Sequence, residues 1–107
     1  MKKVLFLCSK NKLRSPTAEA IFSDVDGWEV YSAGISSDAE VHVSLEDIEW
    51  ADHIFVMETV HKKKLSSKFG RAIKDKKVIT LDIPDNYDYM DSELINILKS
   101  KIPRLVN

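Results

Sequence analysis

Four short strand-like segments, separated by segments with helical spacing, constrain the fold of this 107-residue chain more than any other feature. They lie at residues 4–7, 28–33, 53–57 and 77–81. The first is continuously apolar, which is typical of a strand buried on both faces of a parallel sheet. Because parallel neighbours need a crossover, the alternation predicts an α/β fold. We expect one domain over residues 1–107, a three-layer sandwich with a four-stranded parallel sheet in the order 2-1-3-4 and helices on both faces.

The segments between the strands carry signals for where helices begin and end. Ser15 and Pro16 predict the start of the first helix, with Ser15 as its N-cap, and the pair 26–27 (Asp-Gly) predicts its end. Ser44 and Asp47 resemble a capping box for a short helix that runs to residue 50.

Two further helices are expected in the second half of the chain. Residues 59–69 place apolar side chains on one face, and Gly70 is expected to close that helix. Asp91 is expected to cap the last helix, and Pro103 weakens its final turn. The apolar face of the last helix is predicted to consist of Leu94, Leu98, Ile102 and Leu105.

The composition excludes several classes of protein. Apolar residues make up 44% of the chain and charged residues 31%, as in ordinary soluble domains. Sixteen Lys and Arg against 17 Asp and Glu leave a formal charge of −1, whereas binding to duplex DNA needs an excess of cations. One cysteine cannot form an intrachain disulfide, and the apolar run at residues 4–7 is shorter than the ~7–15 residues of a signal-peptide core. We expect a cytoplasmic protein with no nucleic-acid or membrane partner; its oligomeric state stays open.

The loop after the first strand carries the strongest chemical pattern in the chain. Cys8 ends the strand, five residues follow, and Arg14 precedes the predicted helix. Backbone N–H groups that curl toward a helix N-terminus form an anion-binding nest, and a guanidinium adds two parallel donors. The same positive field stabilises a thiolate. The sequence therefore predicts a phosphate-binding loop that consists of Ser9, Lys10, Asn11, Lys12, Leu13, Arg14 and Ser15, with Cys8 as nucleophile.

Two of these side chains are expected to support the others. Ser15 is placed to donate a hydrogen bond to the sulfur of Cys8, and Asn11 to brace the loop through backbone groups. The alternative is that Cys8 is an inert core residue, because free cysteine is among the most buried residue types. The fixed offsets of Asn11, Arg14, Ser15 and Pro16 from the cysteine favour the functional interpretation.

These residues resemble the low-molecular-weight protein tyrosine phosphatase family, whose active-site loop reads C-x-x-N-x-x-R-S-P between the first strand and the first helix. The resemblance continues at residues 16–20, 32–34 and 51–57, and in the pair His61 and Leu65. It implies a phosphomonoester hydrolase that acts on phosphotyrosine in proteins or on small aryl phosphates. The family's mechanism passes through a cysteinyl-phosphate and needs no cofactor and no metal.

The chain departs from the family at three places. Lys10 stands where the family usually has Gly, and Leu13 replaces a second loop cysteine. The stretch between Gly34 and Ser44 is too short for a helix that longer members have. Substrate preference therefore transfers less securely than the chemistry.

The family takes its general acid from the loop after the fourth strand, which here spans residues 82–89. Asp82 and Asp85 flank a proline, and neither reproduces the family's Asp-Pro order. We favour Asp85 as the acid, because it lies further out along the loop, where it can lean over the nucleophile. Asp88 is a third candidate.

Other side chains have structural explanations. Tyr87 and Tyr89 are candidates for an aromatic wall of the cleft or for simple packing residues. The three histidines, at positions 42, 53 and 61, are interpreted as loop, strand-start and helix-face residues, and none has metal-ligand spacing.

Two other functions remain open. An arsenate reductase shares this loop, but a thiol relay needs further cysteines, which this chain lacks. A catalytically silent phosphate- or phosphopeptide-binding module would explain Lys10 in the loop and the displaced acid.

Overall fold

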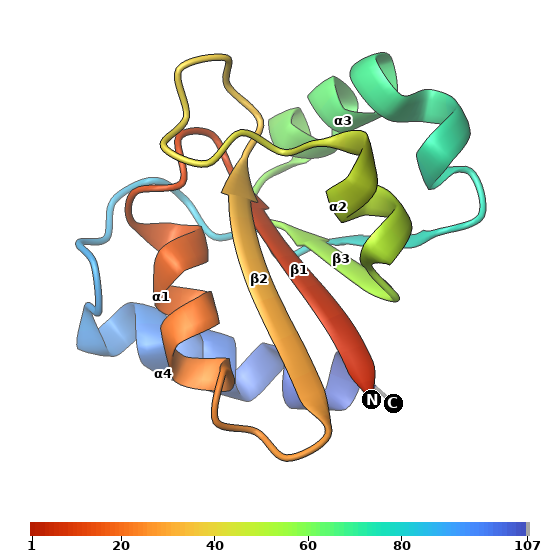
Figure 1. Ribbon diagram of the computed structural model, residues 1–107. Coiled ribbons are helices and arrows are strands. Elements are labelled where there is room, and N and C mark those ends of the chain that lie inside the picture. The colour runs from red at the N-terminus through yellow and green to blue at the C-terminus, as the bar shows by residue number, and fades with distance from the viewer. Residues whose placement is uncertain (107) are drawn as a thin grey trace.

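The computed structural model describes residues 1–106 and contains a four-stranded parallel sheet in the order β2-β1-β3-β4 (Figure 1). The strands are β1 (Lys2–Cys8), β2 (Trp28–Gly34), β3 (His53–Val56) and β4 (Lys77–Thr80). The helices are α1 (Arg14–Phe22), α2 (Leu45–Trp50), α3 (Thr59–Ile73) and α4 (Ser92–Lys101), followed by a 3-10 turn at Pro103–Leu105. The predicted α/β class and the strand order 2-1-3-4 are confirmed.

The sheet separates two hydrophobic layers. Helices α1 and α4 cover one face and α2 and α3 the other, as Figure 1 shows. Along β1, Val4 and Phe6 pack into the first layer, whereas Leu5 and Leu7 pack into the second. All four side chains are fully buried, because successive side chains of a strand point to opposite faces. The continuous apolar run in the sequence follows from this two-sided burial.

Aromatic packing ties α1 to the centre of the sheet. The ring of Phe6 stacks on Phe22 of α1 and Phe55 of β3, with centroid distances of 5.9 and 5.6 Å. Truncation of such a buried ring to alanine typically costs about 3–5 kcal/mol of stability. This contact anchors the last turn of α1, where Phe22 lies, to the face of the sheet.

The first helix differs from the prediction at both ends. It begins at Arg14, its N-cap is Leu13, and Ser15 is therefore not the cap. The Ser15 hydroxyl lies 3.0 Å from the sulfur of Cys8 instead, because the loop turns inward at that point. The helix ends at Phe22, before the expected Asp-Gly pair, and Gly27 with φ of 82° forms the turn that leads into β2.

The other helix signals are mostly confirmed. Ser44 and Asp47 form the capping box of α2, and the Asp91 side chain accepts from the N–H of Glu93 at the start of α4. Gly70 does not end α3. The backbone kinks at Phe69, with φ −129° and ψ 30°, and one further turn continues to Ile73.

The apolar face predicted for the last helix is divided between α4 and the 3-10 turn that follows it. Leu94 and Leu98 are buried on α4, and Ile102 is buried at its C-cap. Leu105 lies in the 3-10 turn that Pro103 begins, in agreement with the weakened final turn.

Gly34 is where the segment before α2 approaches the loop after β1. A Cβ atom at this position would lie 2.5 Å from the Cβ of Ala39 and 2.7 Å from the carbonyl oxygen of Ser9. The N–H of Gly34 donates to Val41 at 2.7 Å, and its carbonyl accepts from Val43 at 2.9 Å. Only a residue without a side chain allows both chain segments to come this close.

Gly34→Ala is expected to destabilise the protein by about 1–3 kcal/mol and to displace the loop after β1, because backbone atoms must move. Chemical denaturation measures the stability, and phosphate titration followed by NMR measures the loop. Gly70→Ala is the control, since nothing lies within 4 Å of its added Cβ. Equal stability of the two variants would contradict the close approach at Gly34.

Candidate active site

The loop between β1 and α1 is held from outside by its carbonyl groups. The carbonyl of Cys8 accepts from Ile35 N–H at 2.9 Å, that of Ser9 from Ser36 N–H at 2.8 Å, and that of Lys10 from Glu40 N–H at 3.1 Å. The C=O and N–H of a peptide unit point in opposite directions, so the amides of this loop turn to its inside. Asn11 N–H accordingly points at the sulfur of Cys8, at 3.3 Å. The loop is the amide nest that the sequence predicted.

Asn11 organises the inside of the loop. Its φ of 58° lies in the left-handed region, which asparagine tolerates better than most residues. Its side-chain amide donates to the hydroxyls of Ser15 and Ser32, each at 3.0 Å. The brace thus runs through side-chain hydroxyls, not through the backbone groups that we expected. Because Ser15 already accepts from Asn11, its own hydroxyl proton is free to point at the sulfur of Cys8.

Cys8 lies at the base of a cavity of about 350 Å³. Its side chain borders the hydrophobic core on one side and this cavity on the other, so it is not sealed in apolar surroundings. The cavity is lined by Cys8, Ser9, Lys10, Lys12, Leu13, Arg14 and Asp85. Among the predicted loop residues, Asn11 and Ser15 do not line it and instead contact the sulfur from behind.

The Arg14 guanidinium is buried and held in one orientation. Its Nη1 donates to the Glu58 carboxylate and to the carbonyl of Ile83, both at 2.7 Å. These two bonds use both protons of Nη1, so Nε and Nη2 carry the donors that remain for an anion. Nε lies 3.8 Å from an Asp85 carboxylate oxygen.

His61 supports the loop from the opposite side. Its Nδ1 accepts from the N–H of Glu58 at 3.1 Å, so the proton of a neutral ring lies on Nε2. Nε2 lies 2.9 Å from the hydroxyl of Ser9 and donates to it. Burial and the neighbouring Arg14 charge lower the pKa of His61 to about 4, despite the opposing influence of Glu58. The ring is therefore a neutral donor at physiological pH, and it is more than a helix-face residue.

The structure separates the three candidate acids. Asp85 lines the cavity together with Cys8 and Arg14. Asp82 has φ of 57° and borders a neighbouring hollow beside Glu58. Asp88 lines neither of these hollows.

Of the two roles left open for Tyr87 and Tyr89, a wall of the cleft or simple packing, the structure does not show the wall. Tyr87 packs against the hydrophobic layer beneath α1 and α4, and Tyr89 is exposed. Neither ring lines the cavity that contains Cys8, whose mouth carries Lys10 and Lys12 instead.

The sequence did not predict three residues that support the site: the acids Glu58 and Glu19 and the hydroxyl of Ser32. Glu58 follows β3 and anchors Arg14, 44 positions earlier in the chain. Ser32 accepts from Asn11 and donates to Glu19. The resemblance at residues 16–20 and 32–34 contains Glu19 and Ser32, and it was the sequence signal that could have found them; Glu58 lies just beyond the resemblance at residues 51–57.

Two absences concern residues 1–106. In that stretch, no three His, Cys, Asp or Glu side chains are grouped so as to hold a metal ion. None of the helices there has the length and hydropathy to cross a membrane.

The cysteine sulfur lies at the end of a parallel strand, receives an inward-pointing loop amide and shares a cavity with a fixed guanidinium, which is an arrangement suited to a cysteine-dependent phosphatase. Residues 3–44 match the family model described as low molecular weight phosphotyrosine protein phosphatase. The chain belongs to the low-molecular-weight protein tyrosine phosphatase family, as the loop resemblance predicted.

Individual relatives agree with this family. A protein-arginine-phosphatase of Geobacillus stearothermophilus is 33% identical over 98 residues, which covers 69% of this chain and 66% of the relative. The solved YwlE arginine phosphatase of the same organism is 27% identical, with a TM-score of 0.76 over 92% of this chain and 89% of that one. A cysteine-to-serine mutant of YwlE arginine phosphatase, with a phosphorylated active-site serine, is 26% identical, with a TM-score of 0.72 over 96% and 99% of the two chains.

The low pKa of His61 makes stability depend on pH. Unfolded His61 takes up a proton near its ordinary pKa of 6.5, whereas the folded ring resists protonation down to about 4. Stability is therefore unaffected above pH 6.5 and falls as the pH drops toward 4, by up to about 3 kcal/mol. Urea denaturation of wild type and His61→Gln measures this difference.

Above pH 6.5, the free energy of unfolding of the variant is expected to be lower than that of wild type by a constant amount. Below pH 6.5, it is expected to decline less steeply with falling pH than that of wild type. His42→Gln, in the exposed loop before α2, is the matched control and should follow the wild-type slope. Parallel curves for wild type and His61→Gln would show that His61 does not titrate as described.

Proposed function

We propose that this protein is a protein phosphatase that hydrolyses phosphomonoesters through a cysteinyl-phosphate on Cys8. The observation that carries the proposal is the position of the Cys8 sulfur, which receives the Asn11 N–H and the Ser15 hydroxyl and lies in one cavity with Arg14 and Asp85. A cysteine that only fills space in the core would not need two hydrogen-bond donors and a neighbouring guanidinium.

In the first step, the Cys8 thiolate attacks phosphorus and the bond from phosphorus to the leaving oxygen breaks. Nε and Nη2 of Arg14 and the inward amides of the loop bind the equatorial oxygens, on which charge develops. The Asp85 carboxyl group gives its proton to the leaving oxygen, which departs as a neutral alcohol or phenol.

In the second step, the Asp85 carboxylate takes a proton from water, and the resulting hydroxide attacks phosphorus. The bond between sulfur and phosphorus breaks, its electron pair returns to Cys8, and inorganic phosphate leaves. Fixed donors supply the charge stabilisation, so neither step requires a metal. The relative whose active-site serine is phosphorylated supports a covalent phosphoryl group on the equivalent nucleophile.

Phosphotyrosine is the substrate that the charge at the cavity mouth favours. Lys10 and Lys12 both line the cavity. The Lys10 ammonium lies 3.6 Å from the Asp38 carboxylate, which offsets its charge, so the repulsion of a cationic leaving group rests on Lys12. A phosphoarginine side chain keeps a positively charged guanidinium, whereas a phenol is neutral when it departs. The second candidate substrate is nevertheless phosphoarginine, because all three similar proteins described above are named arginine phosphatases.

Cytoplasmic location and the lack of a nucleic-acid partner belong to the same proposal. They rest on the near-neutral charge and the single cysteine of the chain.

Cys8→Ser is expected to abolish turnover of an aryl phosphate and to retain binding of inorganic phosphate, because the amide loop and Arg14 persist. Steady-state assays and phosphate titration measure the two properties. A silent binding module would show affinity without turnover already in the wild type, and wild-type activity in Cys8→Ser would refute the nucleophile.

Asp85→Asn is expected to lower turnover of phenyl phosphate by about 10²–10⁴-fold and that of an activated nitrophenyl ester much less, because only the poor leaving group needs the proton. Asp82→Asn and Asp88→Asn are matched controls in the same loop. If Asp82→Asn shows the leaving-group dependence instead, Asp85 is not the acid.

Lys12→Gln is expected to lower the preference for a phosphotyrosine peptide over a phosphoarginine peptide by up to about fivefold, the factor that corresponds to about 1 kcal/mol for a partly screened charge. The ratio of the two kcat/KM values measures the preference. Lys99→Gln, on α4 and outside the cavity, is the control. A wild type that prefers phosphoarginine would overturn the assignment of phosphotyrosine.

A further inference from the structure

The outer edge of β2 is open. β2 is the edge strand: one side pairs with β1 along its length, and the outer side is bridged only at its end, between Gly34 and His42. The Gly34 N–H points outward to Val41, and alternate residues of a strand share one edge, so the peptide groups of Val30 and Ser32 face outward as well. Among residues 1–106 no strand pairs with the outer edge of β2 before Gly34. Ser32 is buried, so the backbone available for a further strand lies in the exposed half of β2, at Val30.

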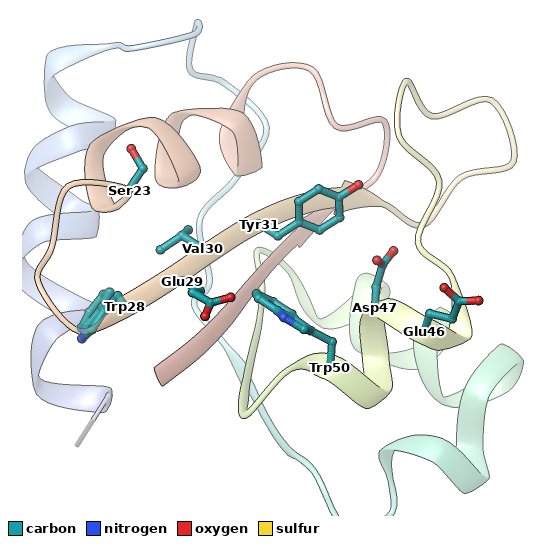
Figure 2. A pocket seen from close by; sticks show the side chains of 8 residues that line it. All are labelled: Ser23, Trp28, Glu29, Val30, Tyr31, Glu46, Asp47 and Trp50. Atoms are coloured by element: carbon teal, nitrogen blue, oxygen red, sulfur yellow. The ribbon is translucent and has the colours of Figure 1, made fainter. Parts of the chain in front are cut away.

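A groove of about 630 Å³ runs along this edge, between the end of α1 and helix α2. It is lined by Ser23, Trp28, Glu29, Val30, Tyr31, Glu46, Asp47 and Trp50. Figure 2 shows Tyr31 and Trp50 beside each other on the α2 side of the strand, with Val30 and Ser23 toward α1. None of these residues lines the cavity that contains Cys8.

The groove presents aromatic surface. The rings of Tyr31 and Trp50 meet edge to face, with centroids 6.5 Å apart and an interplanar angle of 77°. Tyr31 remains 36% exposed, so the pair is only partly covered by the protein itself. Aromatic faces of this kind attract the ammonium of Lys and the guanidinium of Arg.

The groove is also acidic. Glu29, Glu46 and Asp47 line it, and no Lys, Arg or His does. Burial together with the negative charges of Asp47 and Glu19 raises the pKa of the Tyr31 hydroxyl. In a chain whose net charge is only −1, this concentration of negative charge is local.

We propose that this groove binds an extended, Lys- or Arg-rich segment of a partner protein, which adds as a fifth strand beside β2. The N–H and carbonyl of Val30 supply the backbone hydrogen bonds, as in other cases of strand addition. Cationic side chains of the segment lie over the Tyr31–Trp50 pair and against the three acids. A second copy of this chain fits less well, because a two-fold contact through β2 sets Glu29 near its own counterpart.

Fluorescence titration tests the proposal directly, since both tryptophans of the chain, Trp28 and Trp50, line the groove. The probe is the blocked peptide Thr-Lys-Val-Arg-Val-Lys-Thr. Two control peptides carry Glu in place of every cation, or N-methyl groups on alternate amides. The basic peptide is expected to bind in a saturable manner and more weakly as salt increases, and both controls are expected to bind at least about tenfold more weakly.

The double variant Glu29→Lys with Glu46→Lys is expected to bind the basic peptide about tenfold more weakly than wild type, or weaker still. Glu49→Lys is the matched control, because Glu49 lies on α2 but does not line the groove. Turnover of an aryl phosphate should be the same in all variants, which shows that they are folded. The substitutions leave the Ser44–Asp47 capping box of α2 intact.

Three results would overturn the proposal. The first is equal binding of the basic and acidic peptides, and the second is unchanged affinity in the double variant. The third is a dimer in sedimentation equilibrium that Glu29→Lys dissociates, since the groove would then be an interface between copies of this chain.

Discussion

Three hydrogen bonds to the outside of one loop are the constraint on which the site depends. Ile35, Ser36 and Glu40 donate to the carbonyls of Cys8, Ser9 and Lys10, and this turns the loop amides toward the sulfur. Without these bonds the carbonyls would be free to rotate inward, where their dipoles would repel an anion. The short segment after Gly34 supplies this bracing. The missing side chain of Gly34 lets that segment come close enough.

The second support of the site comes from β3. The residues after this strand place Glu58 on the Arg14 guanidinium and His61 on the Ser9 hydroxyl. A buried guanidinium without a carboxylate would carry an uncompensated charge, which is costly in a medium of low polarity. The same ion pair orients the remaining donors of Arg14, so one contact both stabilises the fold and prepares the site. The low pKa of His61 follows from its burial in this cluster and keeps the ring neutral.

The molecule separates its charges although its net charge is close to zero. Lys10 and Lys12 line the cavity beside Cys8, whereas Glu29, Glu46 and Asp47 line the groove along β2. The first surface favours a phosphate group on a neutral leaving group, and the second favours a cationic polypeptide. The carboxyl end of β2 adjoins the phosphate-binding loop, and its open edge borders the acidic groove. A partner held at the groove would therefore be anchored on the same strand that supports the site.

The chain's own pattern was enough to predict the parallel sheet and the Cys8–Ser15 loop, because these depend on apolar runs, capping residues and spacings between near neighbours. Local pattern was also enough for the capping box of Ser44 and Asp47, whereas it misplaced the start of α1 and the end of α3. Asp85 was already the favoured acid from the sequence, and in the structure it lines the cavity with Cys8. The Arg14–Glu58 pair and the His61–Ser9 bond emerged only from the folded structure. Each of these joins residues that are dozens of positions apart, and no local rule of propensity or periodicity encodes which distant side chains the packing of a sheet brings together.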